Sequence, residues 1–245
     1  MPIFSPDALS LVDILLACLL VIGLPLEGEL ARGGVLAKVR AGAPGARIRL
    51  YRQTIFMLWG LTLPLLVVWA VAGRDWAALG FGIAGGWTAL AGWALAALAC
   101  GFFLLQYFNV RLSPAARAEA RKVFSKMDGA LCFLPATEKE RGLYRLTGLT
   151  AGITEEILFR GYLIWAFGLI VPVWAAAAAS LALFVFLHRY QGRAGLIQVA
   201  GIGIVLTLVV LLSGSTWPAI ALHIVTDIAN GETAWQATQP EDTMA

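Results

Sequence analysis

The stretch TEEILFRGYL, residues 154–163, places two adjacent glutamates and an arginine inside a long apolar run. An ionised side chain at the centre of a bilayer costs roughly 2.5–3.5 kcal/mol even on the forgiving insertion scales. Three such residues in one membrane segment therefore indicate a function. The rest of the chain decides whether this run crosses a membrane.

The composition is that of a membrane protein. Of the 245 residues, 60% are hydrophobic and 13% are charged, and the mean hydropathy is +0.80, outside the range of soluble domains. The sequence therefore predicts an all-α polytopic membrane protein with about seven transmembrane helices. Apolar runs of sufficient length occur at 8–26, 54–72, 82–108, 146–168, 172–188, 194–213 and 216–231.

The basic residues predict the orientation. Of the eighteen Lys and Arg residues, sixteen lie in the connections 27–53, 109–145 and 189–193, which fall on one side of a seven-helix arrangement. Arg160 is intramembrane and only Arg74 lies opposite. The positive-inside rule then predicts cytoplasmic connections, an N-terminus outside and a cytoplasmic C-terminus. The net charge of +3 reflects this topology, and we expect no nucleic-acid binding.

Three regions are expected along the chain. Residues 1–140 hold the N-terminal transmembrane helices and a cytoplasmic amphipathic loop, 141–231 hold the charged membrane segments, and 232–245 form an acidic C-terminal tail. The loop sequence SPAARAEARKVFSKM (113–127) predicts a helix with one basic face. This helix either lies on an anionic membrane surface or is a solvated linker helix.

The two glutamates differ in their helical positions. Glu156 and Arg160 are four residues apart with the acid first, the favourable order for an ion pair on one helix face. Glu155 points about 100° away and has no partner on its own helix. Below it on the same face lie Gly148 and Gly152, which leave room for a water or a peptide backbone, or serve close helix packing.

The chain has only two histidines, and both fall in apolar segments with a second motif residue four positions away. FVFLH places Phe184 and His188 on one helix face, and HIVTD places His223 and Asp227 on another. Helix depth puts these groups and Glu155 between the midplane and the cytoplasmic surface, which predicts a cavity open to the cytoplasm. Two histidines and two carboxylates also fit a zinc site, although HExxH is absent.

The ordered motifs EExxxR, FxxxH and HxxxD, within residues 145–230, resemble the CPBP family of intramembrane proteases, also called the Abi or CAAX-protease family, which includes the Rce1-like endopeptidases. The resemblance implies a catalytic core in 141–231. It implies that Glu155 activates a water, that His188 assists it, and that His223 with Asp227 stabilises the oxyanion. The Rce1 branch has Asn at the position of Asp227, and an ionised Asp cannot donate to an oxyanion. Asp227 would be protonated or would orient His223, so prenylated substrates are not assumed.

The sequence thus predicts an intramembrane endopeptidase that hydrolyses a membrane-associated protein or peptide with a glutamate-activated water. No cofactor is favoured, and zinc held by Glu155, His188, His223 and Asp227 is the alternative. The second hypothesis is a catalytically silent membrane scaffold of the same fold. An ion or metal transporter is the third, because transporters usually show inverted repeats and no internal repeat is found. The expected location is a prokaryotic plasma (inner) membrane, with the active site opening toward the cytoplasm.

Overall fold

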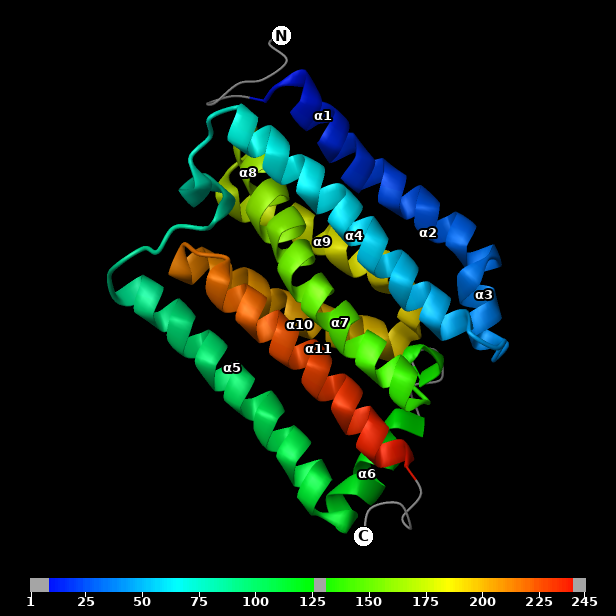
Figure 1. Cartoon of the computed structure of the whole chain (residues 1–245). Coiled ribbons are helices and arrows are strands. Elements are labelled where there is room, and N and C mark those ends of the chain that lie inside the picture. Colours follow the sequence, from blue (N-terminus) through cyan, green and yellow to red (C-terminus); the bar gives the residue numbers. More distant parts are fainter. Residues whose placement is uncertain (1–8, 126–130, 240–245) are drawn as a thin grey trace.

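The protein is helical throughout the part of the chain that the structure describes. The computed structural model describes residues 9–125 and 131–239, and its regular elements are all helices (Figure 1). In chain order they are α1 Leu11–Cys18, η1 Leu19–Gly23, α2 Leu24–Gly33, α3 Val35–Arg40, α4 Ala46–Val71, η2 Trp76–Leu79, α5 Trp87–Leu112, α6 Pro114–Ser125, η3 Leu131–Phe133, α7 Glu138–Glu155, η4 Glu156–Leu163, α8 Ile164–Gly168, α9 Val173–Leu187, η5 His188–Gln191, α10 Gly192–Ser213 and α11 Trp217–Thr238.

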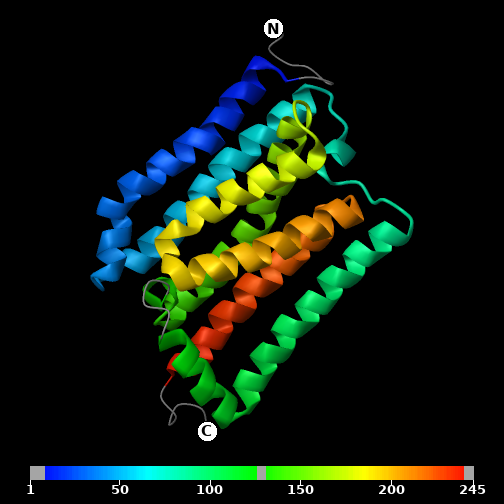
Figure 2. The ribbon, with the colours of Figure 1, turned by 180° about the vertical axis from the view of Figure 1, so that it is seen from behind.

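The charged segment lies at the centre of a bundle of long helices. α7 and its continuation η4 run between α4 and α11, and α5 covers the other side of α11 (Figure 1). Behind this layer α9 and α10 form an antiparallel pair, joined by the short turn η5 (Figure 2). The segment that carries Glu155 and Glu156 is therefore covered by other helices on several sides.

Within the described residues, four stretches are long and apolar enough to cross a membrane: Leu11–Leu30, Ala46–Val71, Trp87–Leu112 and Val173–Ser213, the last of which contains both α9 and α10. Between 11% and 33% of the residues in their most apolar windows are buried, so their surfaces are largely free to face lipid. The two central helices, α7 with η4 and α11, are not among these stretches. They carry the charged residues, and the seven-helix topology stays a prediction.

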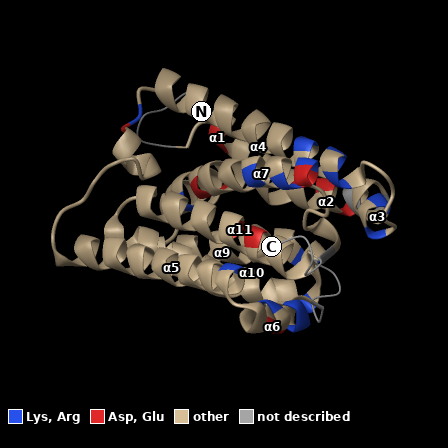
Figure 3. Ribbon diagram, turned by 60° about the horizontal axis from the view of Figure 1, so that its bottom comes forward, with Lys and Arg blue, Asp and Glu red and all other residues tan. Residues whose placement is uncertain are grey.

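The basic connections meet at one end of the bundle. Arg40 Nη2 donates to the Tyr190 carbonyl at 2.9 Å, and Arg47 Nε donates to the Cys132 carbonyl at 2.8 Å. These bonds join the connections 27–53, 109–145 and 189–193 to one another. Lys and Arg accordingly gather at the end of the bundle that holds α3 and α6 (Figure 3).

A buried ion pair closes the opposite end of the bundle. Arg74, the basic residue that the sequence places apart from the others, donates to both carboxylate oxygens of Asp13, at 2.7 and 2.5 Å. Its guanidinium also lies 5.1 Å from the Trp69 ring and 4.6 Å from the Trp165 ring. Since the bidentate pair is nearly inaccessible to solvent, it ties the start of α1 to the chain that follows α4.

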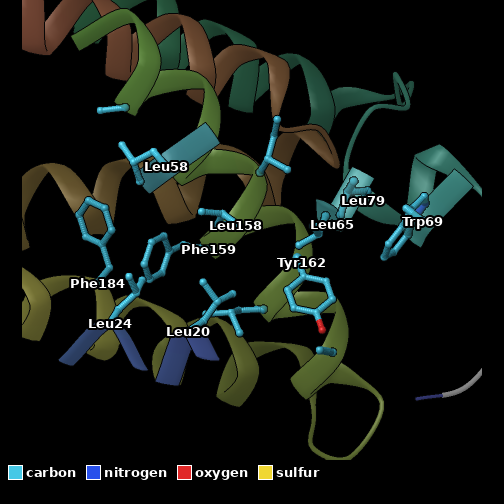
Figure 4. Close-up of a cluster of buried hydrophobic side chains, with 14 residues drawn as sticks. Leu20, Leu24, Leu58, Leu65, Trp69, Leu79, Leu158, Phe159, Tyr162 and Phe184 are labelled. Carbon is cyan, nitrogen blue, oxygen red and sulfur yellow. The ribbon is translucent and has the colours of Figure 1, made fainter. Parts of the chain in front are cut away.

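η4 is a π-helix, and all eight of its residues are buried. Hydrogen bonds in a π-helix run from residue i to i+5, which widens the turn and lets neighbouring side chains reach the backbone. Ser180 of α9 donates its hydroxyl proton to the Phe159 carbonyl at 2.7 Å. Apolar side chains from several elements surround η4 (Figure 4), among them Leu20, Leu24, Leu58, Leu65, Trp69 and Phe184.

Two glycines of α7 allow α11 to approach closely. A Cβ at Gly152 would lie 2.5 Å from Ile224 Cγ1 and 2.8 Å from the Ile224 backbone nitrogen, and a Cβ at Gly148 would lie 3.1 Å from Asp227 Cβ. Of the two sequence-based alternatives, close helix packing is therefore right, and a gap for water or peptide above these glycines is wrong. The consequence is that α11 brings its own polar residues directly against Glu155.

The C-terminal helix is longer than the sequence indicates. α11 continues to Thr238, so residues 232–238, which the sequence assigns to an acidic tail, are helical. Glu232 is buried and accepts hydrogen bonds from Arg141 Nη2 at 2.6 Å and from Arg145 Nε at 2.7 Å. This predicted boundary is wrong because ion pairs with α7 stabilise the last turns of α11.

The amphipathic helix α6 packs against protein. Ser113 caps it by accepting a hydrogen bond from the Ala116 amide at 3.2 Å. Arg121 donates to the carbonyls of Ala237 and Gln239, at 2.7 and 3.1 Å, and α6 contacts α5 and α11. Neither sequence-based alternative includes this contact with the end of α11.

Residues outside the described part of the chain include Lys126 and Met127 of the predicted helix and 240–245 of the predicted tail.

Candidate active site

The two adjacent glutamates lie where the backbone changes from α-helix to π-helix. Glu155 is the last residue of α7 and Glu156 is the first residue of η4. The Glu156 side chain is fully buried, whereas 13% of the Glu155 side chain is accessible. π-Helical turns within α-helices are frequent at functional sites, so this change of backbone is itself a signal.

Glu156 Oε1 joins two helices in one hydrogen-bonded group. Arg160 Nη1 donates to it at 2.9 Å, and His223 Nδ1 of α11 donates to the same oxygen at 2.7 Å. Arg160 is further held by the Phe184 ring, 4.1 Å from its guanidinium carbon, and by the Gly203 carbonyl at 3.4 Å. The carboxylate thus has two partners, only one of which lies on its own helix.

Glu155 has an oxygen without a hydrogen bond at the centre of this group. Its Oε2 atom is buried and unpaired within the described residues. The Nε2 atom of His223 lies 3.9 Å from this oxygen and 3.7 Å from Asp227 Oδ2. Because Nδ1 of His223 is held by Glu156, Nε2 faces both of the other carboxylates.

The Phe184 ring connects the two histidines. Its centroid lies 4.5 Å from that of the His188 ring and 6.2 Å from that of the His223 ring. His188 Nδ1 donates to the Phe184 carbonyl at 2.7 Å, which leaves Nε2 of the neutral ring as an acceptor. From the sequence, Phe184 was known only as the first residue of the FxxxH motif, with no role of its own. Its position four residues before His188 is the signal from which this contact follows.

Asp227 is the most accessible of the three site residues on α7 and α11. A third of its side chain, 34%, is exposed, compared with 8% for His223. A cavity of about 390 Å³ opens at the basic end of the bundle, and Ala234 and Thr238 of α11 contribute to its lining. None of the four proposed site residues lines this cavity, and Ala234 lies about 10 Å along α11 from Asp227.

The four proposed site residues could hold a metal ion only if their donor atoms surround one point. Within residues 9–125 and 131–239, no group of three or more His, Cys, Asp or Glu side chains is arranged to hold a metal ion. A zinc site needs three or four donor atoms at about 2.0–2.3 Å around one point. One nitrogen of each histidine is bonded to another protein group, His188 to the Phe184 carbonyl and His223 to Glu156, and the Nε2 atom of each ring is the remaining candidate donor.

Residues 140–229 match the family model for type II CAAX prenyl endopeptidase, Rce1-like. These residues form an Rce1-like domain. The match confirms the resemblance that the ordered motifs predicted, and it includes all of Glu155, Glu156, Arg160, His188, His223 and Asp227. Comparison with curated proteins and with solved structures gives no match.

The match and the fold agree on the class of protein. CAAX endopeptidases are membrane-embedded proteases that act on membrane-associated proteins, and the chain has four helical stretches suited to a membrane. Together these observations indicate an integral membrane protein that contains a domain similar to these proteases. The match begins at Glu140, so the helices of residues 1–139 lie outside the Rce1-like domain.

Proposed function

We propose that this protein is an intramembrane endopeptidase in which Glu155 is the general base for a water molecule. The observation that carries the proposal is the buried, unpaired Oε2 atom of Glu155, which faces His223 Nε2 at 3.9 Å. A buried carboxylate oxygen without a hydrogen bond is costly. Such a group is retained where chemistry requires it.

The polar atoms around Glu155 Oε2 suit a shared water. Distances of 3.9 Å and 3.7 Å from His223 Nε2 to Glu155 Oε2 and Asp227 Oδ2 are too long for direct hydrogen bonds. They fall in the range where a water bridges polar groups. A water bound there would have the Glu155 carboxylate as a proton acceptor.

In the proposed reaction Glu155 accepts a proton from this water, and the water oxygen attacks the carbonyl carbon of the scissile peptide bond. The carbonyl electron pair moves onto its oxygen, and N–H donors stabilise the resulting oxyanion. When the intermediate collapses, the C–N bond breaks and Glu155 returns its proton to the leaving amine. The products are a new carboxyl terminus and a new amino terminus.

The geometry revises the division of roles among the other residues. The sequence leaves Asp227 either protonated or orienting His223, but the direct hydrogen bond that His223 Nδ1 donates goes to Glu156. We therefore assign Glu156 a second role beyond its pair with Arg160, because it fixes the ring that faces Glu155. His223 donates to the oxyanion through Nε2 when its ring is protonated. Asp227 lies at the accessible side of the site, where a substrate would enter.

Metal-free hydrolysis is part of the proposal, because no group of three or more possible donor side chains within residues 9–125 and 131–239 is arranged to hold a metal ion. Purified protein dialysed against buffer without metal is expected to contain less than stoichiometric zinc and to keep its activity in a chelator. Elemental analysis and peptide cleavage measure both quantities. Stoichiometric zinc, with activity lost in chelator and restored by zinc, would instead indicate metal-assisted hydrolysis.

We also propose that the basic end of the bundle faces the cytoplasm, because Lys and Arg gather there. In a variant that lacks Cys18, Cys100 and Cys132, a single cysteine at Ala41 should be protected from an impermeant maleimide in intact spheroplasts. A cysteine at Gly85, which has open space around it, should react. Labelling at position 41 without permeabilisation would mean that the orientation is reversed.

The decisive test of function is a comparison of membrane proteins from cells that produce the wild type or Glu155→Gln. We expect new amino termini, at bonds within or near membrane segments, in the wild-type sample alone. The experiment also identifies the substrate and its cleavage site. A scaffold of the same fold would give identical sets of termini, and so would a transporter.

A further inference from the structure

His188 is not part of a regular helix. α9 ends at Leu187, and His188 begins the four-residue turn η5, which is followed by Gly192 with a φ of 77°. A 3₁₀ turn of this length has few hydrogen bonds of its own. The position of the His188 ring therefore depends on what other elements contribute around it.

Two aromatic residues form a chain of contacts to this ring. The Tyr190 ring stacks on the His188 ring, with centroids 6.0 Å apart and planes 28° apart. The Phe133 ring of η3 meets Tyr190 edge-on, with centroids 5.3 Å apart and planes 85° apart. Motion of Phe133 or Tyr190 would thus be transmitted to His188.

η3 is fastened to the start of α4. Arg47 Nε donates to the Cys132 carbonyl at 2.8 Å, and the Tyr51 hydroxyl donates to the Phe133 carbonyl at 2.5 Å. The two bonds fix the peptide groups on both sides of Phe133. Phe133 is therefore a fixed support for Tyr190.

The backbone of η5 is held from two further N-terminal elements. Arg40 of α3 donates to the Tyr190 carbonyl at 2.9 Å, and its guanidinium carbon lies 6.0 Å from the Phe133 ring centroid. Arg189 forms an ion pair with Glu29 of α2 and donates to the Pro25 carbonyl at 3.4 Å. Every one of these supports belongs to the part of the chain that precedes the Rce1-like domain.

We propose that the N-terminal part of the chain positions His188 for catalysis, with Phe133 and Tyr190 as positioning residues. The proposal rests on the proposed function and on the assistance to the water that the family resemblance implies for His188. Its physical basis is that a misplacement of about 1 Å in a reacting group can lower a rate by as much as about 100-fold. The hydrogen bond from His188 Nδ1 to the Phe184 carbonyl holds the ring from α9, and the Tyr190 ring, supported by Phe133, is the constraint that the N-terminal part of the chain adds.

Histidine spectra test the positioning without reference to activity. The chain has two histidines, so protein labelled with ¹⁵N in the imidazole rings gives two sets of ring signals, and His223 is an internal reference. Phe133→Leu and Tyr190→Leu are expected to shift and broaden the His188 signals and leave those of His223 in place. Tyr190→Phe keeps the ring and should keep the wild-type His188 signals. Phe56→Leu, an aromatic change on a side chain of α4 that is 76% exposed, is the matched control.

The effect on catalysis is tested with a library of quenched-fluorescence peptides. The kinetics of each variant are measured on the peptide that the wild type cleaves fastest. We expect kcat to fall about 10- to 100-fold in both Leu variants with KM nearly unchanged, and Tyr190→Phe to restore most of it. Unchanged His188 signals in the Leu variants would overturn the proposal, and so would shifted signals with an unchanged kcat. If the wild type cleaves no peptide while the signals shift as expected, the proposed function has failed and the positioning of His188 has not.

Discussion

Glu155→Gln is expected to lower kcat/KM for peptide cleavage by about 10²–10⁴-fold, the usual contribution of a general base, while the melting temperature in detergent stays nearly unchanged. The amide has the shape of the carboxylate but cannot accept the proton of the attacking water. Stability should persist because Glu155 Oε2 makes no hydrogen bond that the substitution would break. Cleavage of a quenched-fluorescence peptide library in micelles and thermal unfolding are the two measurements.

Glu119→Gln is the matched control for this substitution. Glu119 lies on α6 with 69% of its side chain exposed, and its partner Lys122 is equally accessible. The same chemical change there should affect neither activity nor stability, since exposed ion pairs contribute roughly 0–1 kcal/mol. Full activity in Glu155→Gln would remove the general base from the mechanism, and a large loss of stability would show that Glu155 supports the fold.

Sequence patterns predicted the helices well where the pattern is local. Apolar runs indicated each long helix, although α4 begins at Ala46 and α7 at Glu138, well before the apolar runs that predicted them. A criterion based on apolar runs long enough to span the hydrocarbon leaves out the polar residues at the ends of such helices. Their partners, such as the Glu232 carboxylate for Arg141, become known only when distant segments meet.

The π-helix of η4 could not be predicted from residues 156–163 alone. One of its carbonyls, that of Phe159, accepts a hydrogen bond from Ser180, which lies 21 residues further along the chain. A serine in an apolar helix is common and does not specify which backbone it will reach. The i+5 hydrogen bonding thus depends on tertiary contacts that periodicity does not contain.

The residues of the candidate site could be named from the sequence as a hypothesis, but the contacts between them could not. Spacing of four residues correctly indicated that Glu156 and Arg160 could meet, and both are on η4. The bond from His223 to Glu156 depends on how closely α11 approaches α7, and that distance is set by Gly148 and Gly152. From the sequence alone, Gly148 and Gly152 were equally consistent with a gap beside Glu155, because the position of α11 was not known.

Glu156→Gln is expected to lower stability and activity together, in contrast to Glu155→Gln. Glu156 is fully buried and accepts from both Arg160 and His223. Its loss leaves the Arg160 guanidinium buried without a counter-charge, and breaking one half of a buried pair typically costs about 3–5 kcal/mol. The melting temperature should fall accordingly, and the released His223 ring should no longer face Glu155.

The double variant Glu156→Leu with Arg160→Leu separates the two roles of Glu156. Removing both charges removes the uncompensated guanidinium, so part of the lost stability should return. Recovery should be incomplete, because Arg160 also contacts the Phe184 ring and the Gly203 carbonyl. Activity should not return, since His223 Nδ1 still lacks its acceptor. If cleavage recovers together with stability, Glu156 serves only the ion pair; if Glu156→Gln melts like the wild type, the pair does not stabilise the fold.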